Sequence, residues 1–178
     1  IKVEDVSGGK LPSSAENAVE FRDVSLKYEN SSDFSLEHLS FIVPKGSTVG
    51  IVGGTGSGKT SLVNLIPGFY KATEGEVLVN GKNINEISVT NLRERIGIVP
   101  QKSVLFKGTI RENMLWGKSD AADDEIYDAI KTAQASDVID SRPDKLDAFV
   151  SQNGENFSGG QRQRLCIARA LVKKPDIL

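Results

Sequence analysis

Residues 53 to 60 have the types and spacing of a phosphate-binding loop. They follow the pattern G-x-x-x-x-G-K-[ST] and are Gly53, Gly54, Thr55, Gly56, Ser57, Gly58, Lys59 and Thr60. Glycines permit positive φ angles and let backbone N–H groups approach phosphate oxygens without an intervening Cβ. Lys59 supplies a cation for the β- and γ-phosphates, and the Thr60 hydroxyl is a suitable Mg²⁺ ligand. We therefore expect a nucleoside triphosphate and Mg²⁺ here, with the next residue, Ser61, included in the site.

The residues around this loop predict a strand before it and a helix after it. Residues 48–52 are a short apolar run, and the following segment carries Leu62, Val63, Leu65 and Ile66 before Pro67 and Gly68 end it. This context disfavours the alternative of a glycine-rich turn that merely precedes a lysine. The loop does not identify the reaction, because such loops serve kinases, GTPases, motor ATPases and transporters.

A second candidate site begins at Ser158. Ser158 and Gln161 have the spacing of a capping box, in which each residue caps the start of a helix. Capping does not explain Gly159 and Gly160, since glycine inside a helix costs about 1 kcal/mol relative to alanine. We therefore expect a second phosphate contact here, made by bare backbone N–H groups and the Ser158 hydroxyl.

Composition limits the class of protein. The 178 residues are 38% hydrophobic and 26% charged, which is typical of a globular domain with a core. A formal net charge of −2 argues against nucleic acid as a partner. No apolar run approaches the roughly 18 residues of a membrane span, and the first residues lack a signal-peptide core. The single Cys166, in an apolar run, is expected to be a buried thiol.

Patterning predicts strands first and helices later. Residues 1–18 are polar and without periodicity, so they are expected to be a linker. Alternation at Val19 and Phe21, and later at Leu39, Phe41 and Val43, predicts strands. The dipeptide Asn80-Gly81 predicts the turn of a hairpin over residues 76–84. An antiparallel sheet is thus expected beside the phosphate loop, and residues 95–99 are expected to form a further strand.

Helical signals follow. Thr109 and Glu112 have capping-box spacing, and a helical repeat follows at Ile126, Ala129, Ile130 and Ala133. After Ser158 a basic cluster lies on one helix, and we interpret it as a solvated face: Arg162, Arg164, Arg169, Lys173 and Lys174.

With these motifs, the chain resembles the nucleotide-binding domain of an ABC transporter. The family's Leu-Ser-Gly-Gly-Gln signature is matched from residue 157, where Phe157 replaces leucine at a packing position. Gln101, after Ile98-Val99-Pro100, matches the Q-loop, which implies a contact to Mg²⁺ or to the attacking water. Tyr28 matches the aromatic residue that stacks on adenine, although a lone tyrosine after a strand is usually a packing residue.

The stretch from Gln101 to Asn113 is similar to exporter-type cassettes, whose membrane domain precedes the nucleotide domain. The resemblance implies that residues 1–18 are the remainder of that junction. Gly154 and Glu155 resemble the exporter loop that meets the coupling helices, but Ser151-Gln152 replaces the usual Thr-Glu.

The family's later motifs have no counterpart in these residues. The sequence reaches Pro175-Asp176-Ile177-Leu178, inside the expected Walker B strand, before the family's Mg²⁺-associated aspartate, catalytic glutamate and switch histidine. The only histidine, His38, precedes the phosphate loop and is interpreted as a surface residue with local hydrogen bonds. These 178 residues alone are therefore expected to be marginally stable and inactive as an ATPase.

The resemblance implies an α/β fold with a RecA-like P-loop NTPase core, an antiparallel β subdomain and a helical subdomain. The expected division is a linker at 1–18, the core with its β subdomain at 19–105, the helical subdomain at 106–157, and the signature helix with the start of Walker B at 158–178. The implied function is an ATP-hydrolysing motor for export at the cytoplasmic face of a membrane. Its partners would be a second nucleotide-binding domain, identical or different, and transmembrane domains. A soluble ABC ATPase and a non-hydrolysing regulatory cassette remain as alternatives.

Overall fold

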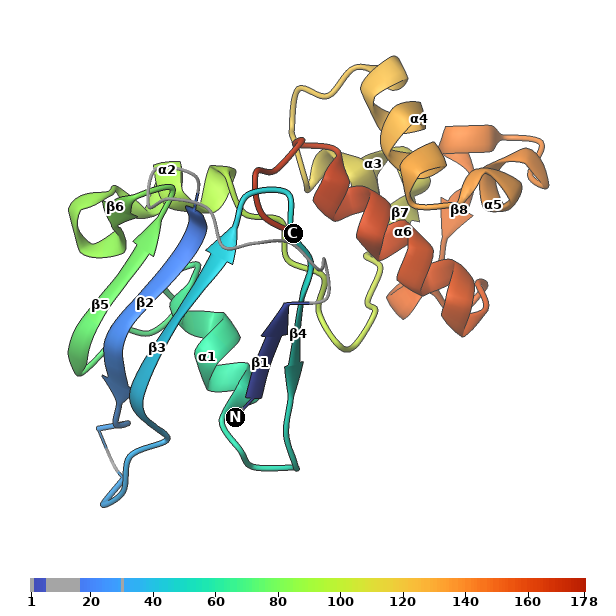
Figure 1. Ribbon diagram of the computed structural model, residues 1–178. Coiled ribbons are helices and arrows are strands. Elements are labelled where there is room, and N and C mark those ends of the chain that lie inside the picture. Colours follow the sequence, from blue (N-terminus) through green and yellow to red (C-terminus); the bar gives the residue numbers. More distant parts are fainter. Residues whose placement is uncertain (1, 6–16, 30) are drawn as a thin grey trace. The chain divides into compact units, whose positions relative to one another are not determined.

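A computed structural model of the chain describes residues 2–5, 17–29 and 31–178 (Figure 1). The chain folds into two compact units, residues 1–93 and 94–178. The division predicted from the sequence, with boundaries after residues 18, 105 and 157, stays a prediction. Within the second unit, Leu105 and the helix that follows Ser158 contribute to the same hydrophobic core.

The main sheet of the first unit has four antiparallel strands in the order β3-β2-β5-β6. The strands are β2 (Asn17–Leu26), β3 (Leu36–Pro44), β5 (Glu74–Val79) and β6 (Lys82–Asn83). Phe21 is the centre of this sheet, since it lies opposite Phe41 on one neighbour and Val77 on the other and is almost fully buried. The predicted strands and the antiparallel sheet are therefore confirmed.

The hairpin between β5 and β6 has the predicted turn. Asn80 and Gly81 have φ angles of 49° and 78°, the two positive values that define a type I′ turn. Strand β6 is shorter than predicted, because Ile84 begins the 3₁₀ helix η2 (Ile84–Glu86). Helix α2 (Val89–Glu94) follows.

The phosphate-loop motif lies between β4 (Val49–Val52) and α1 (Lys59–Leu65), as predicted. Helix α1 buries Leu62 and Leu65, four-fifths of a turn apart on one face. Strand β4 pairs antiparallel with β1 (Lys2–Asp5). The prediction of a linker over residues 1–18 is thus corrected for Lys2–Asp5 and for the first residues of β2, while residues 6–16 lie outside the described residues. Strand β1 was not predicted because its residues show no alternating pattern and because it is formed by pairing with β4, which is distant in the sequence.

The second unit is a helical bundle with one short pair of antiparallel strands. Its helices are α3 (Ile110–Leu115), α4 (Asp123–Thr132), α5 (Ser136–Asp140), the 3₁₀ helices η3 (Lys145–Asp147) and η4 (Gln152–Gly154), and α6 (Gly159–Leu171). Strands β7 (Gly108–Thr109) and β8 (Phe149–Val150) pair antiparallel. The predicted capping box at the start of α3 is present, with Thr109 and Glu112 each bonded to the other's backbone N–H.

A single hydrophobic core holds this bundle together. Helix α4 contributes Ile126, Ala129 and Ile130, and α6 contributes Leu165 and Cys166. The predicted helical repeat is therefore confirmed. Burial raises the pKa of the Cys166 thiol, so this cysteine is the buried structural group that the sequence predicted.

Residues 95–99 do not form the predicted strand. One parallel bridge joins Ile96 to Ile177, with the Gly97 N–H donating to the Ile177 carbonyl at 2.7 Å and the Asp176 N–H to the Arg95 carbonyl at 2.8 Å. A strand requires a ladder of such pairs, and this pairing involves only the residues around one bridge. The direction of the pairing is parallel, as expected of neighbouring strands in a P-loop core.

Candidate functional site

The phosphate loop uses its glycines in different ways. Gly56 and Gly58 have φ angles of +80° and +82°, which L residues rarely adopt. Gly53 is held close to Ser57, since a Cβ on Gly53 would lie 2.5 Å from the Ser57 hydroxyl oxygen. Gly54 has open space around it, with nothing within 4 Å of such a Cβ. The shape of the backbone therefore needs glycine at Gly56 and Gly58, Gly53 leaves room for the Ser57 side chain, and Gly54 leaves a bare surface.

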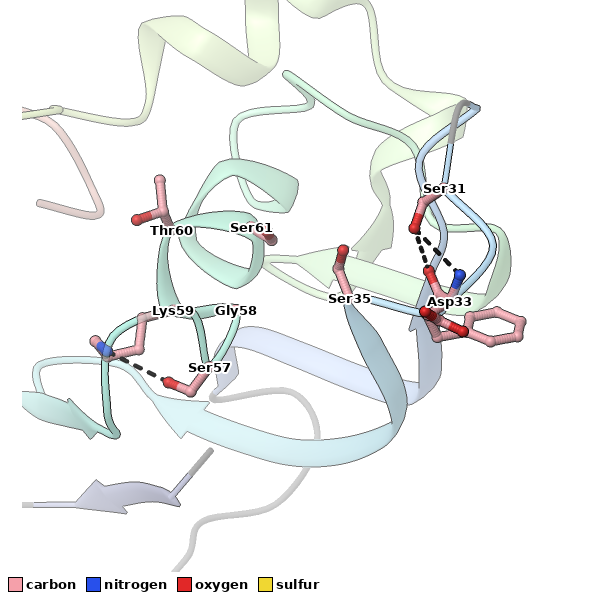
Figure 2. Close-up of a pocket in the computed structure, with 10 residues that line it drawn as sticks. Ser31, Asp33, Ser35, Ser57, Gly58, Lys59, Thr60 and Ser61 are labelled. Atoms are coloured by element: carbon pink, nitrogen blue, oxygen red, sulfur yellow. Dashed lines mark hydrogen bonds between the residues drawn. The ribbon is translucent and has the colours of Figure 1, made fainter.

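Lys59 lies within the curve of this loop. Its Nζ donates to the carbonyl oxygens of Gly53 and Gly54 at 2.7 and 2.6 Å, and to the Ser57 hydroxyl at 3.3 Å, the bond drawn in Figure 2. The ammonium is held by acceptors of its own loop, so its charge is fixed at the place where phosphate oxygens would approach the backbone. The remaining loop residues, Thr55 and Thr60, are exposed.

A cavity of about 430 Å³ lies beside this loop, within the first unit. One wall is formed by residues 56–61 of the loop and α1, and the other by the tip of the β2–β3 hairpin (Figure 2). The hairpin tip contributes Ser31, Asp33, Phe34 and Ser35. The hairpin and the phosphate loop are thus brought together around one polar pocket, whose volume is in the usual range of small-molecule sites.

Tyr28, at the start of the hairpin tip, is linked to the phosphate-loop helix. Its hydroxyl lies 2.7 Å from the Ser61 hydroxyl oxygen, and Ser61 lines the cavity. The Tyr28 ring meets the ring of Tyr70 in a T-shaped contact with centroids 5.0 Å apart. The structure thus brings together Tyr28, Ser61 and the phosphate loop, all predicted from the sequence. It adds Tyr70, which carried no sequence signal because its partner lies 42 positions away.

The residues expected to bind Mg²⁺ present oxygen atoms and no acidic cluster. Thr60, at the first turn of α1, has an exposed hydroxyl, and Gln101, in the second unit, is exposed. Among the described residues, no group of three or more His, Cys, Asp or Glu side chains could hold a metal ion. A hydroxyl and an amide oxygen are hard ligands that suit Mg²⁺ when phosphate oxygens and water complete its shell.

The candidate site at Ser158 is the capped start of α6. The Gln161 N–H donates to the Ser158 hydroxyl at 3.2 Å, and the Ser158 N–H donates to the Gln161 side-chain oxygen at 3.0 Å. The Ser158 hydroxyl accepts in this bond and keeps its own proton for donation to another group. The predicted capping box is therefore confirmed.

The two glycines of this turn are not required by the packing of the chain. A Cβ on Gly160 would meet nothing within 4 Å, and one on Gly159 would meet only the end of the Arg162 side chain at 3.9 Å. An alanine would fit at both positions and favour the helix. The first turn of α6 therefore presents an uncovered backbone, which matches the sequence argument that something must approach it.

Phe157, which replaces the leucine of the signature, is a packing residue. It is 3% exposed and belongs to the helical core. The Arg142 guanidinium lies 4.1 Å from the centroid of its ring, a cation–π distance. The interpretation of residue 157 as a packing position is thus confirmed.

The three arginines of the basic cluster do not form the solvated face that the sequence predicted, whereas Lys174, beyond the end of α6, is exposed as predicted. Arg162 donates to the Phe157 carbonyl at 2.6 Å, and Arg169 donates to the Val104 carbonyl at 3.1 Å. Arg164 forms a two-bond ion pair with Asp137 and lowers the pKa of that carboxyl. Arg164 and Arg169 fasten α6 to segments that lie 27 and 65 positions away along the chain, which is why local patterning did not reveal their role, whereas Arg162 bonds to the residues just before the helix.

His38 is a surface residue with a local hydrogen bond, as predicted. Its Nδ1 lies 2.9 Å from an oxygen of Asp23, and the Asp23 carboxylate raises the pKa of the imidazole. Both residues have positive φ angles, at an irregularity of the β2–β3 ladder. This histidine belongs to the sheet and contributes nothing to the cavity beside the phosphate loop. Among the described residues, no helix is long and apolar enough to cross a membrane.

Comparison with known proteins identifies relatives along nearly the whole chain. A family model described as ABC transporter matches residues 36–178. The chain is 42% identical to the uncharacterized ABC transporter ATP-binding protein YfiB of Bacillus subtilis, over 96% of this chain and 30% of that protein. It is 41% identical to the ATP-dependent lipid A-core flippase of Haemophilus influenzae, over 92% of this chain and 28% of that protein.

A solved structure agrees with this. The structure of a bacterial Atm1-family ABC exporter with ATP bound superposes with a TM-score of 0.83 at 39% identity, over 98% of this chain and 30% of that chain. The predicted α/β fold with a P-loop NTPase core and antiparallel sheet is therefore confirmed. The chain spans less than a third of the length of each of these relatives.

Proposed function

This chain belongs to the ABC transporter family, whose ATPase domain binds ATP, and we propose that it is the motor domain of a membrane exporter. In this function, ATP binding and hydrolysis drive the transport of a substrate by membrane domains. The observation that carries the proposal is the polar cavity between the phosphate loop and the tip of the β2–β3 hairpin. This cavity offers a phosphate site and a separate wall for the rest of the nucleotide.

ATP would lie with its phosphates in the loop and its base towards the hairpin. The backbone N–H groups of residues 53–60 and the Lys59 ammonium would bind the β- and γ-phosphates. Ser61 would contribute its hydroxyl at the start of α1, where it lines the cavity. The Tyr28 ring would stack on the adenine, since an aromatic face suits a base and the Ser61 contact holds the ring beside the cavity.

Mg²⁺ would be held by the Thr60 hydroxyl and by the side chain of Gln101, together with phosphate oxygens. When bound, the ion neutralises charge that develops on the transferred phosphoryl group. Thr60 supports this role through its exposed hydroxyl next to Lys59. Gln101 would orient the attacking water with its amide. Both residues hold or orient groups and transfer no proton themselves.

A second nucleotide-binding domain would complete the site. Ser158 and the backbone N–H groups of Gly159 and Gly160, together with Gln161, would meet the γ-phosphate that is held by Lys59 of the second domain. The open space at Gly159 and Gly160 supports this arrangement, because the chain itself makes no use of the bare backbone. Closure of the two domains on ATP would then move the membrane domains.

The relatives support an exporter in particular. Proteins that match this chain carry the names lipid A-core flippase and multidrug transporter, and a matching structure is an exporter with ATP bound. By this analogy the chain would work at the cytoplasmic face of a membrane, joined to a membrane domain.

The test of this function is ATP-dependent closure in the intact protein. Ser158→Arg would put a bulky cation where the γ-phosphate of the second domain should lie, so crosslinking between the domains under ATP should be lost while ATP binding to one domain is retained. Gln163→Arg is the matched control, since residue 163 is exposed on the same helix. Crosslinking that is undiminished in the Ser158 variant would mean that this motif is only a helix cap.

A further inference from the structure

Two tyrosines from separate segments of the first unit form a pair beside the candidate base site. The Tyr28 and Tyr70 rings are T-shaped, with centroids 5.0 Å apart and planes at 84°. This edge-to-face geometry is one of the two that aromatic pairs prefer, because the positive edge of one ring meets the negative face of the other. Tyr70 is 41% exposed, so the contact is not a by-product of a buried core.

The Tyr28 ring is fixed at two points. Its hydroxyl lies 2.7 Å from the Ser61 hydroxyl on α1, and its ring meets Tyr70. A ring held only at its hydroxyl could still rotate about the axis through that atom. The contact with Tyr70 therefore defines which way the face of Tyr28 is turned.

The backbone of Tyr28 is also tied to the segment that carries Tyr70. The Lys27 N–H donates to the Thr73 hydroxyl at 2.9 Å, and the Thr73 N–H donates to the Ser25 carbonyl at 2.9 Å. Thr73 thus lies beside the end of β2, just before Tyr28. The segments that carry the two rings are joined by these hydrogen bonds of Thr73.

The loop that precedes Tyr70 is held in turn by Arg93. Its guanidinium donates to the carbonyl oxygens of Pro67 and Gly68 at 3.0 and 3.2 Å, and it lies 4.8 Å from the centroid of the Phe69 ring. The Phe69 N–H donates to the Asn64 carbonyl at 3.0 Å. Tyr70 therefore follows directly after residues whose backbone is held by hydrogen bonds.

We propose that Tyr70 is a positioning residue for base recognition, which acts by orienting the ring of Tyr28. The proposal rests on the proposed function, in which Tyr28 stacks on the base of ATP. Tyr70 touches neither the phosphates nor Lys59 in this function. Loss of the Tyr70 ring should weaken the binding of ligands that have a base and leave the binding of ligands without a base unaffected.

The experiment is calorimetric titration of the intact protein with ATP and with inorganic tripolyphosphate. Tyr70→Ala should weaken ATP binding about two- to tenfold, which corresponds to the energy of one aromatic pair, and should leave the affinity for tripolyphosphate unchanged. Tyr70→Phe keeps the ring and should bind both ligands like the original protein. Tyr70→Leu keeps apolar volume without a ring, and it should behave like Tyr70→Ala.

A double-mutant cycle separates an effect through Tyr28 from an independent one. In a Tyr28→Ala background, Tyr70→Ala should cause no further loss of ATP affinity, because the ring to be oriented is absent. Tyr127→Ala is the matched control. Tyr127, on α4 in the other unit, is 43% exposed, and its replacement should change the affinity for neither ligand.

Several outcomes would overturn the proposal. It fails if Tyr70→Ala weakens the binding of ATP and of tripolyphosphate equally. It also fails if Tyr70→Ala has its full effect on ATP binding in the Tyr28→Ala background. If Tyr28→Ala selectively weakens ATP and Tyr70→Ala does not, only this proposal fails. If Tyr28→Ala leaves the preference for ATP over tripolyphosphate unchanged, the stacking role in the proposed function fails, and this inference fails with it.

Discussion

Lys59 and Gly54 are joined by a 2.6 Å hydrogen bond from the ammonium to the carbonyl oxygen. A similar bond of 2.7 Å reaches the Gly53 carbonyl, so the side chain is folded back over the loop that it follows. The positive charge is therefore confined to the volume that the loop encloses. Its position does not depend on the hairpin that forms the other wall of the cavity.

Lys59→Ala should weaken the binding of ATP and of tripolyphosphate to the same extent. Removal of a charge-assisted contact to phosphate should reduce affinity by about tenfold to a hundredfold, the equivalent of 1.5–3 kcal/mol. Calorimetry with both ligands measures this. Lys45→Ala is the control, since Lys45 is exposed in the same unit and should be without effect. A loss limited to ATP would contradict the assignment of Lys59 to phosphate.

Gly160→Ala should separate stability from function. Because a Cβ at this position meets nothing within 4 Å, alanine should stabilise the domain by up to about 1 kcal/mol in denaturant unfolding. The same methyl group would stand on the backbone that we propose meets a γ-phosphate, so ATP-dependent crosslinking of the intact protein should decrease. Gln163→Ala on the same helix should alter neither property. A variant that is more stable and closes normally would argue against a phosphate contact at Gly160.

Asn113→Asp should destabilise the helical unit. Asn113 is 1% exposed, its Nδ2 donates to the carbonyls of Phe106 and Thr109 at 2.8 and 2.9 Å, and its Oδ1 accepts from the Phe106 N–H at 2.8 Å. Aspartate has no N–H to donate, so the carbonyls of Phe106 and Thr109 would lose the hydrogen bonds from this buried side chain, at a cost of roughly 2–5 kcal/mol. Thermal unfolding measures the loss. Asn85→Asp, at an exposed position, is the control, and equal effects of the two changes would show that the buried bonds contribute little.

His38 should titrate above the usual pKa of histidine. The hydrogen bond that the imidazole donates to the Asp23 carboxylate is the main cause, and further acidic groups, Glu74 and Glu37, act in the same direction. Since the pKa is raised in the folded state, the stabilisation is fully present below the unfolded pKa and is lost as the pH rises through the folded value. The protein has one histidine, so a single imidazole signal in an NMR titration reports it. Asp23→Asn should lower the pKa towards its ordinary value; a titration that starts at or below that value would contradict this.

Features that depend on neighbouring residues were predicted well from the sequence. The turn at Asn80-Gly81 and the capping boxes at Thr109 and Ser158 are formed by residues at most three positions apart, so their local chemistry determines the structure. The phosphate loop is equally local, and it lies between the predicted strand and helix.

Features that depend on distant partners were missed or misjudged. Residues 95–99 have a strand-like pattern but pair only around Ile177, whereas Lys2–Asp5 has no such pattern and pairs with β4. Arg164 and Arg169 of α6 resembled a solvated face because their partners, Asp137 and the Val104 carbonyl, are 27 and 65 positions away. Tyr70 escaped notice for the same reason, since one ring in a sequence does not reveal the ring that it meets.

The fastening of α6 by its arginines has a consequence for amide hydrogen exchange. Arg162, Arg164 and Arg169 hold the body of the helix to other segments of its unit, so amides there should exchange only when the unit opens as a whole. The first N–H groups of a helix have no acceptor within it, and at Gly159 and Gly160 no side chain covers the backbone. Protection should therefore rise steeply from the start of α6 towards its end. A ligand that binds to the first turn would be visible as slower exchange at those two amides alone, against a background that is already protected.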